Sequence, residues 1–476
     1  MTTLVEIPVW VLVLMVGFAA IATLDRILVP SVRWFLRGRM ERLVARLNTR
    51  LKRPLHPFRL LGRNDMIVRL IHDPAVMQAV VDHARETGVP ESVAFHEGRG
   101  YAREIVPGFS ALVYFGFAIR AARWISKAFY RVQVGNVDKA LDGIDPNATV
   151  IFVMNHRSNM DYVLVTWLVA GQSAISFAVG EWARIWPLSW LFRAMGAYFI
   201  RRGSRNTLYR RLLARYVQIT AAEGTTQAMF PEGGLSVDGS VGEAKLGLLG
   251  YLVAGMQPGG RDVVFVPVGI AYDRVLEDRL LAEAAKTGDR QFRARPMAML
   301  GFLARTIWRV MRGRFPGFGS AAVAFGAPMS LQAYLAGPGA TVTDLGQMIM
   351  RRVAETVPLL SVPLVAAALV DGPCSKADLA KRMEVILNSL PRLTAKPVEN
   401  TSILLHEGFR TLELRGIIHE VHGLIQPVPG KEPLFDFYAA PIRQRMGAVP
   451  PKRTASEGLN GEDTASPSSP PQQHLL

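Results

Sequence analysis

The amino-acid sequence predicts an α/β protein: a layered mixed sheet flanked by helices, with an N-terminal transmembrane or helical region and a C-terminal helical region. Between residues 130 and 330, short apolar runs of strand type alternate with helical stretches, as in layered α/β domains. Ahead of that domain, residues 7–24 contain no charged side chain. Behind it, residues 359–370 and 375–390 have helical patterns.

The composition limits the class of protein. With 476 residues, half of them hydrophobic, the chain can bury a large core and divide into several domains. Its formal charge of +16 favours an anionic partner, such as a membrane surface, a nucleic acid or a phosphorylated substrate. We expect no nucleic acid, because the charge is concentrated beside an apolar segment and no zinc, RNP-type or helix-turn-helix signature is found. Cys374 is the only cysteine, which excludes an intrachain disulfide and a cysteine zinc cluster.

The N-terminal region is predicted to hold the chain at the inner (plasma) membrane. Residues 7–24 come close to the length that a helix needs to cross a bilayer. Only Glu6 among charged residues precedes them, whereas a secretory signal starts with basic residues, so we expect a retained anchor over residues 1–30. A buried N-terminal helix is the alternative. Basic side chains follow; they place the catalytic domain on the cytoplasmic side and would attract anionic membrane lipids. They are Arg26, Arg33, Arg37, Arg39, Arg42, Arg46, Arg50, Lys52 and Arg53.

Residues 31–129 are predicted to form a basic, helical, membrane-associated region. An amphipathic helix is expected between Asp73 and Arg85. Residues 109–125 are rich in aromatic and aliphatic side chains, with arginines only near their end. This stretch is short for a second crossing, so it predicts a buried or interfacial helix.

The stretch at residues 149–162 is the one most suited to chemistry. An apolar strand over residues 150–154 ends in a polar turn that carries His156, and Asp161 follows five residues later. Open α/β sheets place their ligand crevices at the carboxyl ends of strands, where a neutral imidazole can serve as a general base. Residues five apart lie about 140° apart around a helix axis. His156 must therefore precede the helix, with Asp161 reaching back from its first turn to orient the imidazole. The alternative is a turn histidine and an early-helix acid favoured by the helix dipole.

Two further polar stretches follow predicted strands. Arg201 and Arg202 can bind phosphate through two parallel hydrogen bonds each, although a solvated arginine cluster would have the same sequence. Glu232 can bind an acceptor hydroxyl or an arginine, and Gly233 permits close backbone approach, although an ordinary turn is the alternative. Residues 263–272 predict an apolar structural strand that lines a pocket.

These stretches resemble, in order, the four sequence blocks of the glycerolipid acyltransferase superfamily. The similarity is strongest to the membrane-bound bacterial glycerol-3-phosphate acyltransferases and runs from about residue 73 to residue 442, including residues 102–104 and 434–442. The matching residues are His156 and Asp161 in the first block; Gly196, Phe199, Ile200, Arg201 and Arg202 in the second; Glu232 and Gly233, followed by Lys245 and Gly247, in the third; and Val266 and Pro267 in the fourth.

The resemblance implies acyl transfer from acyl-CoA or acyl carrier protein to the sn-1 hydroxyl of glycerol 3-phosphate, giving lysophosphatidate in phospholipid biosynthesis. His156 would deprotonate the hydroxyl and Asp161 would orient the imidazole. The acyl thioester is a co-substrate, and no metal or other cofactor is implied. The implied substrate-binding residues are Arg201, Arg202, Glu232, Gly233 and Lys245.

One position departs from the family pattern. Leu235 stands where the family usually has arginine after the Glu-Gly block, and leucine cannot contact phosphate. Either another cation such as Arg205 compensates, or the acceptor differs, as in a lysophosphatidate acyltransferase. From another class, the chain could be an inactive membrane-anchored scaffold.

The remaining chain completes the predicted organisation. The acyltransferase catalytic domain is expected over residues 130–330 and a mostly helical region over residues 331–445. That region contains a buried helix at 359–370 and an amphipathic helix after an N-capping Ser375. Residues 446–476 are rich in Pro, Ser, Gly and Gln and predict a disordered tail.

Overall fold

The computed structural model describes residues 62–287 and 317–447, except for residues 136, 181–183, 185–187, 202 and 391–399. It also describes residues 8–11, 15–16, 48–49, 51, 53, 301, 305–306, 308–309, 312 and 315. The predicted anchor over residues 1–30 and the predicted tail over residues 446–476 therefore lie almost wholly outside the described residues. Within the described part, no helix combines the length and apolar character needed to span a bilayer.

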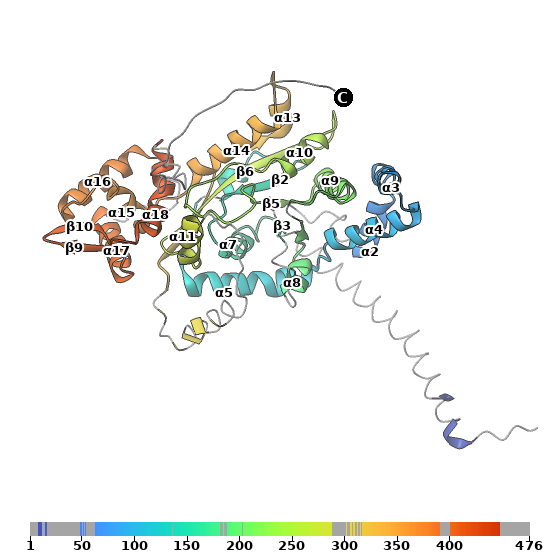
Figure 1. The fold of residues 1–476 in the computed structure, drawn as a ribbon, viewed down its shortest axis with the longest axis horizontal. Coiled ribbons are helices and arrows are strands. Elements are labelled where there is room, and N and C mark those ends of the chain that lie inside the picture. Colours follow the sequence, from blue (N-terminus) through green and yellow to red (C-terminus); the bar gives the residue numbers. More distant parts are fainter. Residues whose placement is uncertain are drawn as a thin grey trace, which may run out of the picture.

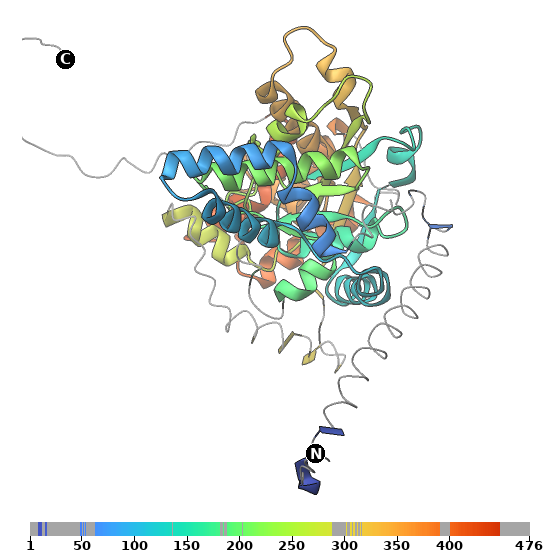
Figure 2. The same ribbon diagram turned by 90° about the vertical axis from the view of Figure 1, so that its right-hand side faces the viewer.

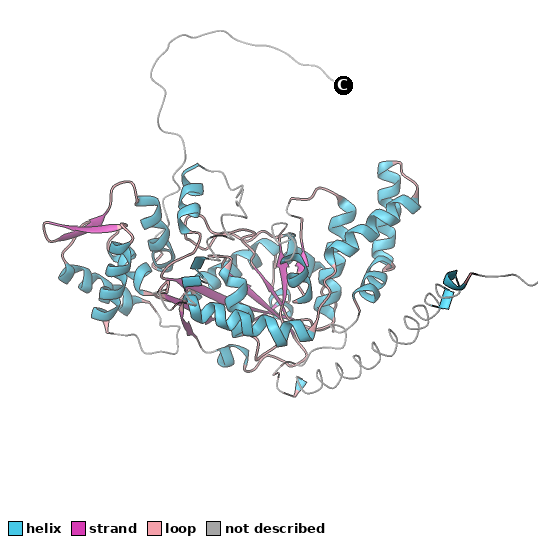
Figure 3. Cartoon of the chain, turned by 90° about the horizontal axis from the view of Figure 1, so that it is seen from below, coloured by secondary structure: helices cyan, strands magenta, loops and turns pink. Residues whose placement is uncertain are grey.

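One mixed sheet forms the centre, with helices on both faces, which confirms the predicted α/β class (Figures 1 and 3). The strands are β1 Arg131–Val134, β2 Thr149–Met154, β3 Ser176–Val179, β4 Tyr198–Phe199, β5 Gln227–Met229, β6 Val263–Tyr272, β7 Ser320–Phe325 and β8 Met329–Ser330. Their order is β1-β7-β6-β2-β5-β3-β4, and β8 also pairs with β6. The run β6-β2-β5-β3-β4 is parallel, whereas β7 and β8 are antiparallel to β6. The carboxyl ends of these five parallel strands therefore meet at one edge.

The sheet is buried on both faces because its strands are apolar at nearly every position. All residues of β2 are buried; Val150, Phe152 and Met154 join one core cluster, and Ile151 and Val153 join the other. This alternation is the period of two expected of a strand. Each face can therefore hold its own layer of helices.

Of the helices that the structure describes, seven cover the first face: three precede β2 and four follow β4 in the chain. They are α2 Arg63–Ile71, α3 Pro74–Thr87, α4 Glu91–Ile105, α9 Thr207–Ala222, α10 Gly247–Ala254, α13 Leu331–Leu335 and α14 Val342–Thr356. The helix predicted between Asp73 and Arg85 is α3, whose N-cap Asp73 accepts a hydrogen bond from the Ala75 backbone N–H. Figure 2 shows α3 lying alongside α9, as their contacts require.

The second face is covered by α5 Ile119–Phe129, α6 Val137–Leu141, α7 Met160–Leu168, α11 Asp278–Thr287, α15 Ser361–Ala368, α16 Lys376–Ser389, α17 Thr401–Leu414 and α18 Glu432–Arg445. The predicted buried helix is α15, in which all residues are buried, and Ser375 caps α16 as predicted. A hairpin of β9 Ile418–Val421 and β10 Leu424–Pro427 was not predicted. These C-terminal helices, orange to red in Figure 1, share one core with the sheet.

The apolar stretch at residues 109–125 is helical, as predicted. It forms the π-helix η2 Leu112–Ala118, which continues into α5. Tyr114 and Ala118 are buried, whereas Leu112 and Phe117 are 58% and 61% exposed. In Figure 1, α5 lies near α8 Leu188–Ala194 along the lower side of the molecule, and α8 contacts η2. This segment thus presents apolar side chains both to the core and to solvent.

Candidate active site

His156 lies in the turn directly after β2, as the sequence predicts. Asn155 fixes the start of the turn, because its side-chain amide donates to the Ile270 carbonyl at 3.0 Å and accepts from the Ile270 N–H at 2.8 Å. The helix α7 begins at Met160, which places Asp161 in its first turn. The His156 Nδ1 atom is 3.0 Å from Asp161 Oδ2. The predicted reach-back of the carboxylate to the imidazole is therefore present.

Asp161 is completely buried and accepts hydrogen bonds at both oxygens. Besides His156, its Oδ2 accepts from the backbone N–H groups of Arg157 at 2.7 Å and Ser158 at 3.0 Å. Its Oδ1 accepts from the Tyr272 hydroxyl at 2.7 Å, and burial together with the Asp161 charge raises the pKa of Tyr272 well above its usual value. The contact between Nδ1 and an acceptor oxygen fits a tautomer in which Nδ1 donates its hydrogen to Asp161 and Nε2 keeps the lone pair.

The aromatic surroundings fix the plane of the imidazole. His156 stacks on Phe230 with 4.1 Å between ring centroids, and Tyr162 meets it edge-on at 5.4 Å. No described residue forms a hydrogen bond with Nε2, although the residue is only 2% exposed. The nitrogen opposite Asp161 is therefore the one left without a partner among the described residues.

Glu232 contacts the backbone of His156. Val153 in β2 pairs with Met229 in β5, so His156 and Glu232, each three residues further on, leave the sheet side by side. Glu232 Oε1 accepts from the His156 N–H at 2.9 Å, and the carboxylate also accepts from the Gly242 N–H. Burial raises the pKa of Glu232 to about 7. The contact with an acceptor hydroxyl or an arginine stays a prediction, and in the structure this carboxylate holds the turn.

Gly233 and Lys245 also lie together at this edge. Gly233 has a φ of +68°, and a Cβ at this position would lie 2.7 Å from Lys245 Cδ. The glycine therefore allows the lysine side chain to pass over the turn. Lys245 itself is exposed, and its N–H donates to the Pro231 carbonyl at 2.9 Å.

Arg201 lies at the same edge of the sheet, just beyond β4, and forms an ion pair with Glu104. Its Nε and Nη2 donate to Glu104 Oε1 at 2.8 Å and Oε2 at 2.6 Å. Arg184 also pairs with Glu104. Three strand spacings separate β4 from β2, roughly 14 Å. A phosphate at Arg201 would have to share the guanidinium with Glu104. Arg202 lies outside the described residues.

Sequence reasoning missed two side chains that support the turn. Tyr272, which binds Asp161, lies on the same face of β6 as Val268 and Ile270, so strand alternation could have found it. Glu277 accepts from the Ser158 hydroxyl at 2.8 Å and the Asn159 N–H at 3.2 Å. Burial raises the pKa of Glu277. No spacing signal in the sequence connects it with the turn.

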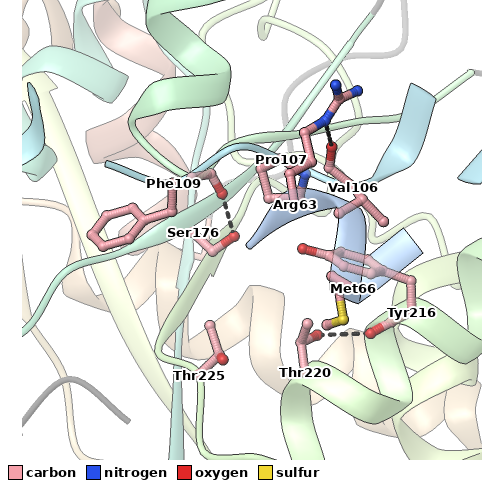
Figure 4. Close-up of a pocket in the computed structure, with 10 residues that line it drawn as sticks. Arg63, Met66, Val106, Pro107, Phe109, Ser176, Tyr216, Thr220 and Thr225 are labelled. Atoms are coloured by element: carbon pink, nitrogen blue, oxygen red, sulfur yellow. Dashed lines mark hydrogen bonds between the residues drawn. The ribbon is translucent and has the colours of Figure 1, made fainter. Parts of the chain in front are cut away.

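A small cavity lies away from this site. Its lining includes Ser176 at the amino end of β3, Thr225 just before β5, and Arg63 and Val106 (Figure 4). None of the predicted site residues lines it. Among the described residues, no three His, Cys, Asp or Glu side chains are grouped to hold a metal ion.

The structure thus places a buried histidine–aspartate pair directly after a parallel strand, beside the Glu-Gly turn of the neighbouring strand. Residues 131–271 match the family model described as acyltransferase. Residues 301–439 match the model described as the glycerol-3-phosphate acyltransferase C-terminal region. The two matched regions together cover the sheet domain and most of the C-terminal helices, so the chain is similar to glycerol-3-phosphate acyltransferases over both parts.

Two curated relatives carry the name glycerol-3-phosphate acyltransferase. The protein from Aeromonas hydrophila subsp. hydrophila is 27% identical over 364 residues, which cover 71% of this chain and 44% of the relative. The protein from Pseudomonas entomophila is 28% identical over 358 residues, covering 70% and 42%. The chain thus spans less than half of the length of these relatives. The crystal structure of the 1-acyl-sn-glycerophosphate (LPA) acyltransferase from Thermotoga maritima is 18% identical, with a TM-score of 0.32 over 62% of this chain and 97% of that one.

Proposed function

We propose that this protein transfers an acyl group from acyl-CoA or acyl carrier protein to the sn-1 hydroxyl of glycerol 3-phosphate, producing lysophosphatidate. The observation that carries the proposal is the 3.0 Å contact between His156 Nδ1 and Asp161 Oδ2, which leaves Nε2 facing away from the acid. The names of the curated relatives support glycerol 3-phosphate as the acceptor.

The reaction needs one base and no enzyme nucleophile. His156 Nε2 takes the proton of the acceptor hydroxyl while the oxygen attacks the thioester carbonyl carbon. The tetrahedral intermediate collapses, the C–S bond breaks, and the leaving thiolate takes the proton from the imidazolium. Asp161 stabilises the imidazolium between these two steps. A positioned base of this kind contributes about 10² to 10⁴ in rate.

The acceptor phosphate needs a cation within reach of the turn. Lys245 is exposed above Gly233, and we propose that it contacts the phosphate. Arg201 follows β4 at the same sheet edge and would exchange part of its pairing with Glu104 for the phosphate. We propose Arg202, the next residue in the sequence, as a further contact. Leu235 packs against the apolar core.

Acceptor identity is tested by measuring thiol release from acyl-CoA and from acyl carrier protein with a panel of acceptors. We expect thiol release from the acyl thioester when glycerol 3-phosphate is the acceptor, and little release with glycerol, which lacks the phosphate. Replacing Lys245 by Met should raise KM for glycerol 3-phosphate by about tenfold or more, because a charge-assisted hydrogen bond is worth about 1.5–3 kcal/mol. The exposed Lys381 in α16, replaced by Met, is the matched control.

Lysophosphatidate is the second candidate acceptor. The leucine at position 235 and the engagement of Arg201 by Glu104 both reduce the positive charge available to a small phosphorylated polyol. A monoacylated acceptor would gain binding energy from its chain as well as from its phosphate. Acylation of lysophosphatidate without acylation of glycerol 3-phosphate would select this candidate.

We also propose that the protein works at the cytoplasmic face of the inner membrane, in contact with anionic lipids. Besides the N-terminal segment, the support comes from apolar side chains exposed on neighbouring helices: Leu112 and Phe117 in η2, Trp124 in α5 and Trp190 in α8. Exposed Arg120, Arg123 and Lys127 lie on α5. Aromatic and basic side chains together suit the headgroup level of an anionic bilayer.

Dye-labelled single cysteines in the full chain test this membrane contact. The variants, each combined with Cys374→Ser, are Phe117→Cys, Trp190→Cys and, as a control, Leu414→Cys, which is 77% exposed on α17. We expect a blue shift of emission at positions 117 and 190, but not at 414, with vesicles of phosphatidylglycerol and phosphatidylcholine. Binding of the protein without any shift at 117 and 190 would contradict the proposed contact.

A further inference from the structure

The side chain of Arg157, next to His156, is buried against a backbone carbonyl and an aromatic ring. It is 2% exposed, and its Nη1 donates to the Gly239 carbonyl. Its guanidinium lies 4.3 Å from the centroid of the Phe437 ring. Among the described residues, its Nε has no hydrogen-bond partner. Backbone carbonyls and a ring thus replace the carboxylate that normally accompanies a buried arginine. Since burying a charge is costly, this placement calls for a role.

Arg157 lies where three distant segments meet. The loop at residues 235–241 hydrogen-bonds the catalytic turn, because the Ser236 N–H donates to the His156 carbonyl at 2.8 Å. The same loop touches α18 at Gly239, where a Cβ would lie only 2.0 Å from the Phe437 carbonyl oxygen. The turn, the loop and α18 are therefore packed as one unit around the Arg157 guanidinium.

A second contact fixes the loop to α18. The Val241 N–H donates to Gln444 Oε1 at 2.8 Å, and Gln444 Nε2 donates to the Val241 carbonyl at 2.9 Å. Phe437 and Gln444 are seven residues apart, about two turns of helix. The loop therefore follows α18 along much of its length, so a movement of α18 would be passed to the loop and to the turn.

The charge of Arg157 also acts on the acids that hold His156. The ionisable groups around the guanidinium are Asp161 of α7, Tyr438 of α18, Glu232 and Asp238. Asp161 binds the imidazole of His156 and Glu232 binds its backbone N–H. The arginine lowers the pKa of Glu232 against the larger opposing effect of burial. A buried positive charge here favours the ionised form of Glu232, the acid that holds the backbone of the turn.

We propose that Arg157 is a positioning residue that fixes the His156 turn from the side of α18, so that the C-terminal helix sets the orientation of the base. This inference rests on the proposed acyl transfer, in which His156 is the base. The planar guanidinium can stack on Phe437 and donate to Gly239 at once, which lysine can do only in part.

Kinetics of Arg157→Gln and Arg157→Lys test the role in catalysis. We expect kcat of Arg157→Gln to fall about 10- to 100-fold with KM nearly unchanged, because a misplaced base affects the chemical step rather than binding. Arg157→Lys should recover part of kcat, because it keeps the charge. Arg382→Gln is the matched control: Arg382 also donates to backbone carbonyls, those of Ala368 and Gly372, but in the C-terminal helices. Its kcat should equal that of the unmodified protein.

Amide hydrogen exchange tests the positioning without relying on activity. In Arg157→Gln, residues 155–161, 236–241 and the start of α18 should exchange faster together, and Phe437→Leu should give the same pattern. Arg382→Gln should leave these segments unchanged. Unchanged exchange in both Arg157→Gln and Phe437→Leu, or a kcat of Arg157→Gln equal to that of the unmodified protein, would overturn the inference. If the unmodified protein acylates no acceptor, the proposed function fails while the exchange comparison still decides the positioning.

Discussion

Asp161 shows how much of this site depends on a single carboxylate. It accepts hydrogen bonds from His156 Nδ1, from the N–H groups of Arg157 and Ser158, and from the Tyr272 hydroxyl. Asp161→Asn keeps the shape but removes the charge that stabilises the imidazolium. We expect kcat to fall about 10² to 10⁴-fold with little change in KM. Steady-state kinetics check this, with the exposed Asp378→Asn in α16 as the control. Equal kcat values for Asp161→Asn and the unmodified protein would contradict the assigned role.

Glu232 makes a prediction about stability and pH. Its pKa of about 7 in the folded protein lies above the ordinary value of 4.5 for a glutamate, so folding favours its protonated form. The stability associated with this proton is fully present below pH 4.5 and is lost as pH rises through 7. Between pH 4 and pH 8, the free energy of unfolding of the unmodified protein should therefore fall by roughly 3 kcal/mol relative to that of Glu232→Gln. Urea unfolding at several pH values measures this difference, and a difference that is constant with pH would argue against the raised pKa.

At the scale of the element, the loop at residues 235–241 depends on a glycine. Gly239 has a φ of +87°, and a Cβ there would lie 2.0 Å from the Phe437 carbonyl oxygen. Gly239→Ala should cost about 3 kcal/mol or more, because overpacking adds to backbone strain. Gly430→Ala is the control: its φ is +82°, but no atom lies within 4 Å, so about 1 kcal/mol of strain alone is expected. Denaturant unfolding compares the two. Equal losses would show that α18 is not packed against this loop.

The sequence predicted the elements better than the contacts between them. Local patterns predict the parallel strands, α3, α15 and the Ser375 cap. This is because apolar periodicity, burial and helix capping depend on residues that are close together in the sequence. The meeting of His156 and Asp161 followed from helix geometry. The pairing of Arg201 with Glu104 joins residues 97 positions apart, and no local pattern encodes it. The contact of Glu232 with the His156 backbone depends on the register of β2 and β5, which the sequence pattern leaves open.

At the scale of the whole molecule, the C-terminal helices and the sheet share a core. Phe152 and Val266 of the sheet belong to the same apolar cluster as Val365, Leu412 and Phe437 of α15, α17 and α18. A chain ending at residue 330 would expose that face, so we expect it to lose cooperative thermal unfolding. A chain ending at residue 447 lacks only the predicted disordered tail and should keep the melting temperature of the full chain. Calorimetry distinguishes the two, and a well-folded product ending at 330 would show that the C-terminal helices are dispensable for the core.

The most direct test of the central claim is the rate of acyl transfer to glycerol 3-phosphate in His156→Ala compared with the unmodified protein. With folding verified by circular dichroism, we expect kcat/KM to fall by about 10² to 10⁴-fold or more. An inactive scaffold would keep its biological effect after this replacement. Acyl transfer at an undiminished rate in His156→Ala would contradict the assignment of the base and the mechanism built on it.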